Sequence, residues 1–480
     1  MDHFYQVLSI IIVGLYWLLV ATVSFRIALK RRAFGVSIAW LLLIYILPIV
    51  GVAVYLLFGE LNLGQMRSKR ALNMFRHYRR WFEDIKPNSK QLSAHARPIH
   101  ELSLRRLGIP SQFGHDIKLF SDTELILSAL IDDINQAQTS IAMEFYIWQP
   151  GGLADEVASA LIEASKRGVK IRLLLDAAGS KVFFSTKWPA RFKGEGIEVV
   201  KALGVHPLRM FMRRLDLRQH RKIVVIDDKV AYTGSMNLVD ARYFKTGAGV
   251  GQWIDIMVRI QGPSVPVLSS VQAWDWEFET GQRYLQEISR QSSQHYEDNY
   301  ALQVIPSGHG LPENVIQQIL LLNIHHAQKS IILTSPYFVP SESLLEALKM
   351  AAYRGVKVQL IVPLKNDSLM VGWASRSYFA ELLEAGVEIH QFDGGLLHTK
   401  SMLVDGEHSL IGTVNLDIRS LRLNSEVSLA IDSPAFCQQL HQLLESYLQS
   451  AKPLSLANWR QRPTYKKLLE QFFYMFGPLL

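Results

Sequence analysis

Two copies of one short motif hold the side chains in this chain that are best suited to chemistry. Both have the form H-x-K-x4-D, and they are formed by His220, Lys222 and Asp227 and by His398, Lys400 and Asp405. Each copy continues to a turn of the form G-[ST]-x-N, which supplies Ser235 and Asn237 in the first copy and Thr413 and Asn415 in the second. One such motif arises by chance in roughly a few per cent of chains of this length, so two copies with a shared continuation indicate a shared function.

The spacing within the motif predicts which side chains act together. Side chains alternate between the two faces of a strand, so the histidine and the lysine two residues later share one face. The aspartate has the opposite parity from the lysine, which predicts a role at the strand end, away from the reacting atom. If the two copies pack face to face about a pseudo-twofold axis, His220 and His398 converge on one pocket with two ammonium groups and two amides. Such a pocket suits a phosphodiester.

Two imidazoles in one pocket suit a two-step displacement at phosphorus. One, neutral, attacks phosphorus and becomes a phosphohistidine. The other, protonated, gives its proton to the leaving alkoxide and later removes a proton from the incoming hydroxyl. A free histidine has a pKa of about 6.5, so opposite protonation states need little perturbation. The lysines, amides and hydroxyls would stabilise charge on the phosphorane-like state. We expect no cofactor and no metal ion, since no carboxylate cluster accompanies either motif.

Each histidine needs a partner that fixes its tautomer, and two acids stand at similar distances downstream. Asp255 lies 35 residues after His220, and Glu426 lies 28 residues after His398. We expect each acid to orient the histidine of the other copy. A third acid, Glu144, stands in an apolar run, and it either lines the pocket or belongs to a structural ion pair.

The chain around the motifs is a duplicated unit. Short matches recur in the same order at offsets of 187 to 190 residues: Ala137–Ile141 with Ala327–Ile331, Arg167–Lys170 with Arg354–Lys357, and Gly196–Glu198 with Gly386–Glu388. Within each copy, apolar runs of strand length alternate with segments of helical period. This order predicts an α/β fold of two tandem α/β/α repeats, residues 116–290 and 291–450, each with a mostly parallel sheet between helix layers.

The first sixty residues are predicted to form a hairpin of two transmembrane helices. Residues 7–25 and 36–58 carry no charge, and each run is long enough to cross a hydrocarbon core of about 30 Å. A cleaved signal peptide is less favoured, because no Lys or Arg precedes the first run. A basic linker, residues 61–115, would follow. Basic residues flank both runs, so the positive-inside rule leaves the catalytic side of the membrane open, with a preference for the cytoplasm.

Composition narrows the class of protein and its partners. Among 480 residues, 49% are hydrophobic and 20% are charged, which excludes a disordered polyelectrolyte. The formal net charge of +8 favours an anionic partner, either nucleic acid or acidic lipid. The single cysteine excludes an intramolecular disulfide framework and a thiolate zinc site.

Two segments combine basic and apolar side chains in the way that membrane-interfacial helices do. The loop 203–219 directly precedes His220, and its arginines are Arg209, Arg213, Arg214 and Arg218. This loop either meets the headgroup and acyl chains of a lipid substrate or packs on the surface as an amphipathic helix. The other segment is the C-terminal tail, residues 451–480, in which Lys466 and Lys467 precede a run of aromatic residues.

The residues described above resemble those of a known family. The duplicated motif is similar to that of the phospholipase D superfamily, and the resemblance covers residues 116–450. The N-terminal region, with Pro48, Gly51, Tyr55 and Gly59, resembles the membrane segment that precedes this domain in bacterial cardiolipin synthases of the long, Gram-negative type. The resemblance implies two tandem phospholipase D-like repeats with pseudo-twofold symmetry. It also implies a multi-pass protein of the bacterial inner membrane.

The resemblance further implies a reaction. Two molecules of phosphatidylglycerol, an anionic phospholipid of the bilayer, would give cardiolipin and glycerol through a phosphatidyl-histidine. The first motif of the superfamily usually supplies the nucleophile and the second the acid and base, which assigns these roles to His220 and His398. The family also supports the crossed pairing of acids and histidines. The implied partners are lipid, not nucleic acid.

Other functions share these motifs. A phospholipase D-type hydrolase would release phosphatidic acid through the same first step, with water as the acceptor. A membrane-tethered nuclease would need a basic and aromatic stacking platform, which we do not find in the sequence. A non-catalytic membrane scaffold would retain only the fold. The residues leave open the oligomeric state, and whether phosphatidylethanolamine can be a donor.

Overall fold

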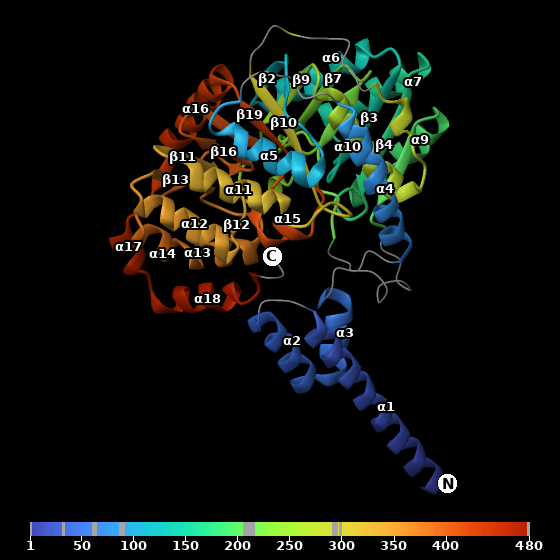
Figure 1. Cartoon of the computed structure of the whole chain (residues 1–480), viewed down its shortest axis with the longest axis vertical. Coiled ribbons are helices and arrows are strands. Elements are labelled where there is room, and N and C mark those ends of the chain that lie inside the picture. The colour runs from blue at the N-terminus through green and yellow to red at the C-terminus, as the bar shows by residue number, and fades with distance from the viewer. Residues whose placement is uncertain are drawn as a thin grey trace. The chain divides into compact units, whose positions relative to one another are not determined.

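The computed structural model describes residues 2–30, 34–59, 65–85, 92–204, 217–289, 296 and 300–477. The chain divides into a small N-terminal unit, which extends to Ser68, and a large unit, which begins at Lys69 (Figure 1). The large unit contains both motifs and the two large sheets, of seven and nine strands.

The N-terminal unit is built from apolar helices. Helix α1 (Asp2–Leu29) is, within the described ranges, the one helix long and apolar enough to cross a membrane. Helices α2 (Phe34–Ile46) and α3 (Pro48–Val54) follow, and a π-helical turn (Tyr55–Gly59) directly continues α3. A small core joins the three helices, and it contains Val20, Val23, Ile27, Ile44, Val52 and Tyr55.

The second predicted span, residues 36–58, is not one continuous helix. The helix stops at Leu47, whose φ and ψ are −123° and 73°, because the proline that follows has no backbone N–H to continue the ladder. Helix α3 then packs so closely on α2 that a Cβ at Gly51 would lie 2.4 Å from the Leu43 carbonyl oxygen. Helix α2 alone has 13 residues, which gives a length of about 20 Å. It is therefore too short to cross a bilayer by itself.

The first repeat forms a seven-stranded sheet, ordered β2-β9-β7-β6-β3-β4-β5. Its strands are β2 (Asp116–Phe120), β3 (Ser140–Phe145), β4 (Lys170–Asp176), β5 (Glu198–Ala202), β6 (Ile223–Ile226), β7 (Val230–Gly234) and β9 (Met257–Gln261). Only β3, β4 and β5 are parallel neighbours, and the other pairs are antiparallel. The expectation of a mostly parallel sheet is therefore wrong. Strand β6 pairs antiparallel with β3, and a tight turn leads directly from it into β7, so that β6 and β7 pair as a hairpin.

The second repeat has the same core order with an added strand at each edge: β1-β10-β19-β17-β16-β11-β13-β14-β20. Its strands are β1 (Gln112–Phe113), β10 (Ala301–Ser307), β11 (Ser330–Thr334), β13 (Lys357–Pro363), β14 (Glu388–Phe392), β16 (Ser401–Val404), β17 (His408–Gly412), β19 (Glu426–Asp432) and β20 (Ala451–Pro453). The strands β10 to β14 in this order match β2 to β5 of the first sheet position by position. The tandem duplication predicted from short sequence matches is thus a duplication of structure.

Helices of both repeats cover the sheets (Figure 1). Those of the first repeat are α6 (Thr123–Gln136), α7 (Leu153–Lys166), α8 (Lys181–Phe184), α9 (Trp188–Gly194) and α10 (Val265–Thr280). Those of the second are α11 (Val315–His326), α12 (Glu342–Tyr353), α13 (Leu369–Ser377), α14 (Phe379–Glu384), α15 (Ile418–Arg422) and α16 (Pro434–Gln449), followed by α17 (Leu456–Arg460) and α18 (Thr464–Tyr474). Polar caps begin several of them; Asp122, for example, accepts the Leu125 N–H at 2.9 Å in front of α6.

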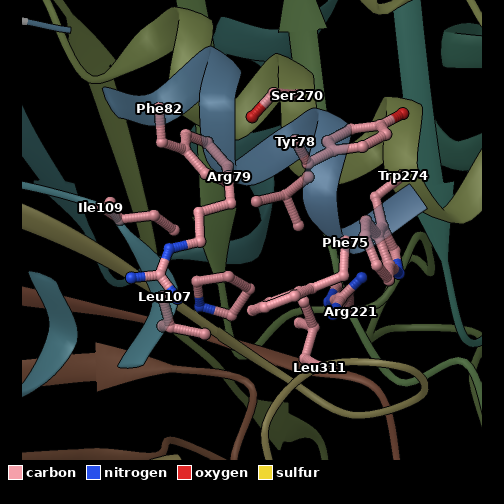
Figure 2. Close-up of a pocket in the computed structure, with 12 residues that line it drawn as sticks. Phe75, Tyr78, Arg79, Phe82, Leu107, Ile109, Arg221, Ser270, Trp274 and Leu311 are labelled. Atoms are coloured by element: carbon pink, nitrogen blue, oxygen red, sulfur yellow. The ribbon is translucent and has the colours of Figure 1, made fainter. Parts of the chain in front are cut away.

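The segment 61–115, expected as a basic linker, contains ordered elements that pack on the repeats. They are α4 (Gln65–Glu83), α5 (Ala96–Leu107) and β1, which pairs with β10. Arg70 of α4 donates to the Phe278 carbonyl oxygen at the end of α10, at 2.8 Å. The rings of Tyr78 and Trp274 meet edge to face, with centroids 5.1 Å apart. Side chains of α4 and α10 enclose a small, mainly apolar cavity, and Arg221 also lines it (Figure 2).

Candidate active site

The two motif histidines face one cavity between the repeats. The cavity has a volume of about 420 Å³, and its lining includes His220, Asn237, His398 and Asn415. Each histidine is placed by backbone contacts with the other repeat. The His220 N–H donates to the Ser425 carbonyl oxygen at 3.0 Å, and the His398 N–H donates to the Ile254 carbonyl oxygen at 2.8 Å. Each histidine is therefore held by the backbone of the opposite repeat.

The carboxylates that orient the histidines come from the opposite repeat. His220 Nδ1 lies 2.9 Å from Glu426 Oε2, and His398 Nδ1 lies 2.7 Å from Asp255 Oδ1. This is the crossed arrangement expected from the sequence. Both carboxylates are buried, and an ionised carboxylate only accepts hydrogen bonds. The proton is therefore held on each Nδ1, which leaves the Nε2 lone pair for chemistry.

The two hydroxyls of the G-[ST]-x-N turns bind these carboxylates. Ser235 Oγ donates to Asp255 Oδ1 at 2.6 Å, and Thr413 Oγ1 donates to Glu426 Oε2. We expected the hydroxyls to stabilise charge on the phosphorus group. The structure instead places both in the buried layer behind the histidines, because each also accepts a backbone N–H there. They hold the carboxylates in position and do not line the cavity.

The motif lysines are buried next to the histidines. Lys222 Nζ donates to the His220 carbonyl oxygen at 2.7 Å, and Lys400 Nζ donates to the His398 carbonyl oxygen at 2.6 Å. Neither lysine is among the described residues that line the cavity, so the two ammonium groups lie behind the histidines and not in the pocket where we expected them. Burial lowers the pKa of Lys222 to about 8 and that of Lys400 to about 7, although Glu426 and Asp255 favour the charged forms.

Burial also lowers the pKa values of the two motif histidines. It lowers the pKa of His220 and that of His398 to about 4, against the opposing effect of Glu426 and Asp255. The expectation of nearly unperturbed values is therefore wrong, since it ignored desolvation. Both imidazoles are neutral at pH 7 in the free protein. A phosphodiester anion in the cavity would favour a protonated imidazole, so substrate binding itself can supply the acid.

The asparagines present their amides differently. Asn237 Oδ1 accepts the Ile147 N–H at 3.1 Å, so its amide group is left as a donor at the cavity. Asn415 Nδ2 lies 3.3 Å from Ser420 Oγ. Both side chains line the cavity, as predicted.

The motif aspartates lie outside the cavity. Asp227 accepts the backbone N–H groups of Gln138, Thr139 and Ser140, and Asp405 accepts those of Gln328, Lys329 and Ser330. Both aspartates have a left-handed backbone, with φ of 55° and 54°. The structure thus separates them from the histidines, and the role at the strand end fits the predicted parity. Their backbone partners are the same Ala-Gln-x-Ser stretches that revealed the duplication.

Glu144 does not line the cavity. Its side chain accepts a hydrogen bond from Gln219 in a buried cluster with Asp275 and Arg221, and Arg221 pairs with Asp275. Burial raises the pKa of Glu144, and the neighbouring Asp275 raises it further. Of the two alternatives, the structure favours the structural cluster. Arg221 also donates to the Glu426 carbonyl oxygen at 2.9 Å, so this cluster supports the strand that carries a histidine partner.

Several cavity residues were not found from the sequence. The ring centroids of Trp253 and His398 are 4.3 Å apart, and those of Tyr146 and His220 are 5.0 Å apart. The ring centroids of Tyr337 and His398 are 6.4 Å apart. Tyr146 follows β3 and Tyr337 follows β11, the equivalent strand of the second repeat, and the two tyrosines are 191 residues apart, so the duplication was the signal that could have found them. Arg419 and Lys245 also line the cavity.

The basic loop 203–219 lies largely outside the described residues. Arg209, Arg213 and Arg214 belong to that part of it. Arg218 is described, and it lines the cavity two residues before His220.

Comparisons with known proteins agree with this geometry. A family model described as "Cardiolipin synthase, PLD-like domain" matches residues 130–265 and 320–448, and one described as the phospholipase D-nuclease N-terminal region matches residues 14–60. The chain is 51% identical to cardiolipin synthase A of Edwardsiella ictaluri (strain 93-146) and of Serratia proteamaculans (strain 568), in each case over 486 residues and 100% of both chains.

Among solved structures, the chain resembles phosphatidylserine synthase of Haemophilus influenzae Rd KW20. The TM-score is 0.60 at 16% identity, and the match covers 81% of this chain and 100% of that one. This likeness shows the fold. Together with the full-length relatives and the paired motifs in one cavity, it leads to one conclusion: the chain belongs to the cardiolipin synthase family of phospholipase D-like proteins.

Proposed function

We propose that this protein is a cardiolipin synthase that transfers a phosphatidyl group from one phosphatidylglycerol to a second, giving cardiolipin and glycerol. The observation that carries the proposal is the single cavity with two imidazoles, each held by a carboxylate of the other repeat. The full-length similarity to proteins named cardiolipin synthase A supports the choice of reaction.

The reaction proceeds in two balanced steps. Nε2 of His220 attacks phosphorus, the bond from phosphorus to the glycerol oxygen breaks, and His398 gives its proton to that oxygen. A hydroxyl of the second phosphatidylglycerol then loses its proton to His398 and attacks phosphorus, and the bond from phosphorus to His220 breaks. The two halves are nearly symmetric in geometry, so the choice of His220 as nucleophile rests on its place in the first motif.

Charge on the phosphorus group is stabilised by residues that are already in place. Lys222 and Lys400 do not line the cavity but lie buried behind the histidines, from where their ammonium charges act on it, and Asn237 and Asn415 bring amides to its wall. Fixed donors in a dry site need no reorganisation during the reaction, which makes them more effective than water. Asp227 and Asp405 act on the fold and not on the substrate.

The N-terminal unit anchors the protein in the bacterial inner membrane. Helix α1 is long and apolar enough to cross the bilayer, which supports this anchor, and the α2 and α3 pair would supply the second hydrophobic element of the multi-pass anchor expected from the sequence. The catalytic repeats lie on the cytoplasmic side, where phosphatidylglycerol is available from the inner leaflet.

The C-terminal helix α18 adds an interfacial contact with lipid. Its exposed apolar side chains include Leu468 and Phe472, with exposed fractions of 66% and 53%, and Met475 directly after the helix is 75% exposed. It packs along α13, and Val371 of α13 lines the cavity. Exposed apolar residues with Lys466 and Lys467 nearby suit the surface of an anionic bilayer. Helix α18 would hold the cavity at the level of the lipid headgroups.

Product analysis tests the reaction. The full chain is reconstituted in vesicles that contain labelled phosphatidylglycerol, and lipids are identified by mass spectrometry. We expect cardiolipin and an equal amount of free glycerol, with none from the His220→Ala variant. Phosphatidic acid as the main product would favour the hydrolase, and an unchanged cellular phenotype in His220→Ala would favour the scaffold.

A further inference from the structure

The residue between the histidine and the lysine differs in kind between the two motifs. In the first motif it is Arg221, and in the second it is Thr399. Both side chains are fully buried. The guanidinium is hydrogen-bonded, whereas the Thr399 hydroxyl has no partner among the described residues. Burying a charged side chain is costly unless it is paired and hydrogen-bonded, so the contacts of Arg221 show what it holds.

The guanidinium of Arg221 joins three elements across the two repeats. Its Nε donates to the Glu426 carbonyl oxygen and its Nη2 to the Ser307 carbonyl oxygen, each at 2.9 Å. Its Nη1 pairs with Asp275 of α10. Ser307 and Glu426 are opposite each other where β10 pairs with β19, so the arginine closes the end of this strand pair. It thereby fixes the backbone of the carboxylate that orients His220.

Buried acids hold the chain on both sides of His220. Asp275 binds Arg221, the residue after the histidine, and Glu144 accepts a hydrogen bond from Gln219, the residue before it. On its other side Arg221 borders the mainly apolar wall formed by α4 and α10 (Figure 2). The acidic cluster is therefore where the charge of the guanidinium is balanced.

The matching positions of the second repeat carry hydroxyls. Glu144 is the fifth residue of β3, and Thr334 is the fifth residue of β11. Thr334 Oγ1 lies 2.8 Å from Ser401 Oγ and accepts the Ser401 N–H at 3.0 Å. A neutral pair of hydroxyls thus stands in the second repeat where the first has a charged cluster.

The two orienting acids are also held differently. Glu426 is the first residue of β19, where strand pairing and Arg221 both fix its backbone. Asp255 lies outside the strands of the seven-stranded sheet, two residues before β9. The surroundings of the two imidazoles are therefore asymmetric, although the imidazoles and their acids are arranged alike.

A nucleophile and a proton carrier need different degrees of restraint. The nucleophile must approach phosphorus in line with the leaving oxygen, and a misplacement of about 1 Å can cost roughly 100-fold in rate. The proton carrier has to serve two oxygens in turn, one leaving and one entering. We propose that Arg221 is a positioning residue, which holds Glu426 and through it the imidazole of His220 for in-line attack. This role rests on the function proposed above and gives a structural reason for His220 as the nucleophile.

A burst experiment with the full chain tests this role. The substrate is detergent-dispersed phosphatidyl-p-nitrophenol, and the parent protein carries His398→Ala, so that only the first step is followed. Nε2 of His220 attacks phosphorus, the bond from phosphorus to the nitrophenol oxygen breaks, and nitrophenolate leaves with that electron pair. The burst amplitude counts folded sites, and the burst rate constant at saturating substrate measures the attack itself.

We expect Arg221→Lys and Arg221→Gln to lower this rate constant about 10–100-fold. The amplitude should stay near one equivalent, and the substrate concentration at half-saturation should change little. Thr399→Val, the matched change in the second motif, should leave all three values unaltered, because it removes a buried hydroxyl that has no partner in the described part of the chain. A smaller amplitude with an unchanged rate constant would show that Arg221 serves only the fold, and would overturn the proposal.

If the Arg221 variants do not fold, Asp275→Asn answers the question, since it removes the charge partner and leaves both backbone carbonyl acceptors in place. Its rate constant should fall about tenfold at an unchanged amplitude, and an unaltered rate constant would overturn the role. A parent protein that releases no burst would overturn the proposed function and the role of Arg221 with it. A parent that gives a burst, with variants that match its rate constant, would overturn the role of Arg221 alone.

Discussion

Nδ1 of His220 lies 2.9 Å from Oε2 of Glu426, a residue 206 positions further along the chain and in the other repeat. Asp255 and His398 repeat the relationship in the opposite direction, 143 positions apart. Neither repeat therefore contains a complete histidine site. Gene duplication without fusion into one chain would require two subunits to meet, whereas here a single polypeptide supplies both halves.

Replacing Glu426 by glutamine should reduce turnover about 10²–10⁴-fold, because an amide can hold the wrong tautomer of His220 and cannot stabilise its charge. Asp255→Asn should act similarly through His398. The measurement is kcat for cardiolipin formation, with circular dichroism to verify the fold. Glu384→Gln, an exposed change on α14, is the control. Full activity in Glu426→Gln would show that Glu426 is not needed to orient His220.

Asp227→Asn should lower stability more than activity. The carboxylate accepts three backbone N–H groups and the Thr139 hydroxyl, and it does not line the cavity. We expect a loss of about 1–3 kcal/mol in the free energy of unfolding, measured by denaturant titration of detergent-solubilised protein. The value of kcat well below the unfolding midpoint should change less than threefold. An Asp227→Asn variant that is stable but has little turnover would show that Asp227 takes part in the reaction.

The pH dependence of kcat/KM should show an alkaline decrease near neutrality. Burial lowers the pKa of Lys400 to about 7 and that of Lys222 to about 8. Their positive charges are fully present below these values and are lost as the pH rises through them, so phosphate binding weakens between about pH 7 and 8. Because kcat/KM reports groups of the free enzyme, it is measured from pH 5.5 to 9.5 at constant ionic strength. A constant value up to pH 9.5 would contradict the lowered pKa values.

The double variant Leu468→Ser, Phe472→Ser should separate interfacial docking from chemistry. With less apolar surface on α18, the rate on long-chain phosphatidylglycerol in vesicles should fall about tenfold. The rate on a short-chain, detergent-dispersed phosphatidylglycerol should stay the same. Tyr353→Ser, which removes an exposed aromatic from α12, is the matched control. A similar decrease on both substrates would show that α18 serves only the fold.

The local sequence pattern was sufficient to predict the two motifs, the duplication, and the pairing of each histidine with an acid of the other repeat. Alternation in a strand predicted Asp227 at the strand end, and Asp227 directly follows β6 in the structure. His220 and Lys222 precede that strand, so the shared strand face predicted for them is not what joins them; instead, Lys222 Nζ donates to the His220 carbonyl oxygen. Two expectations about the fold failed. Strand β6 pairs antiparallel with β3, a direction that the order of apolar runs does not reveal. The second apolar run breaks at Leu47 because the proline that follows has no backbone N–H.

The electrostatics of the site could not be predicted for a similar reason. Residue types alone suggest ordinary pKa values for His220, His398 and Lys400, but the structure buries all three and lowers each value. Ser235 and Thr413 have the right chemistry for a phosphate contact, yet they face the carboxylates. Arg419 was missed because no periodic pattern in the sequence predicts that a residue of the five-residue helix α15 lines the cavity.

The central claim is that two imidazoles act in turn on one phosphorus atom, with His220 as the nucleophile. It is tested with phosphatidyl-p-nitrophenol, whose leaving group needs no acid. The His398→Ala variant should release one equivalent of nitrophenolate in a burst and then stop, because it lacks the base for the second step. Mass spectrometry of an alkaline digest should find the phosphatidyl group on His220. A burst from His220→Ala with the adduct on His398 would reverse the roles, and the absence of an adduct on either histidine would contradict the covalent mechanism.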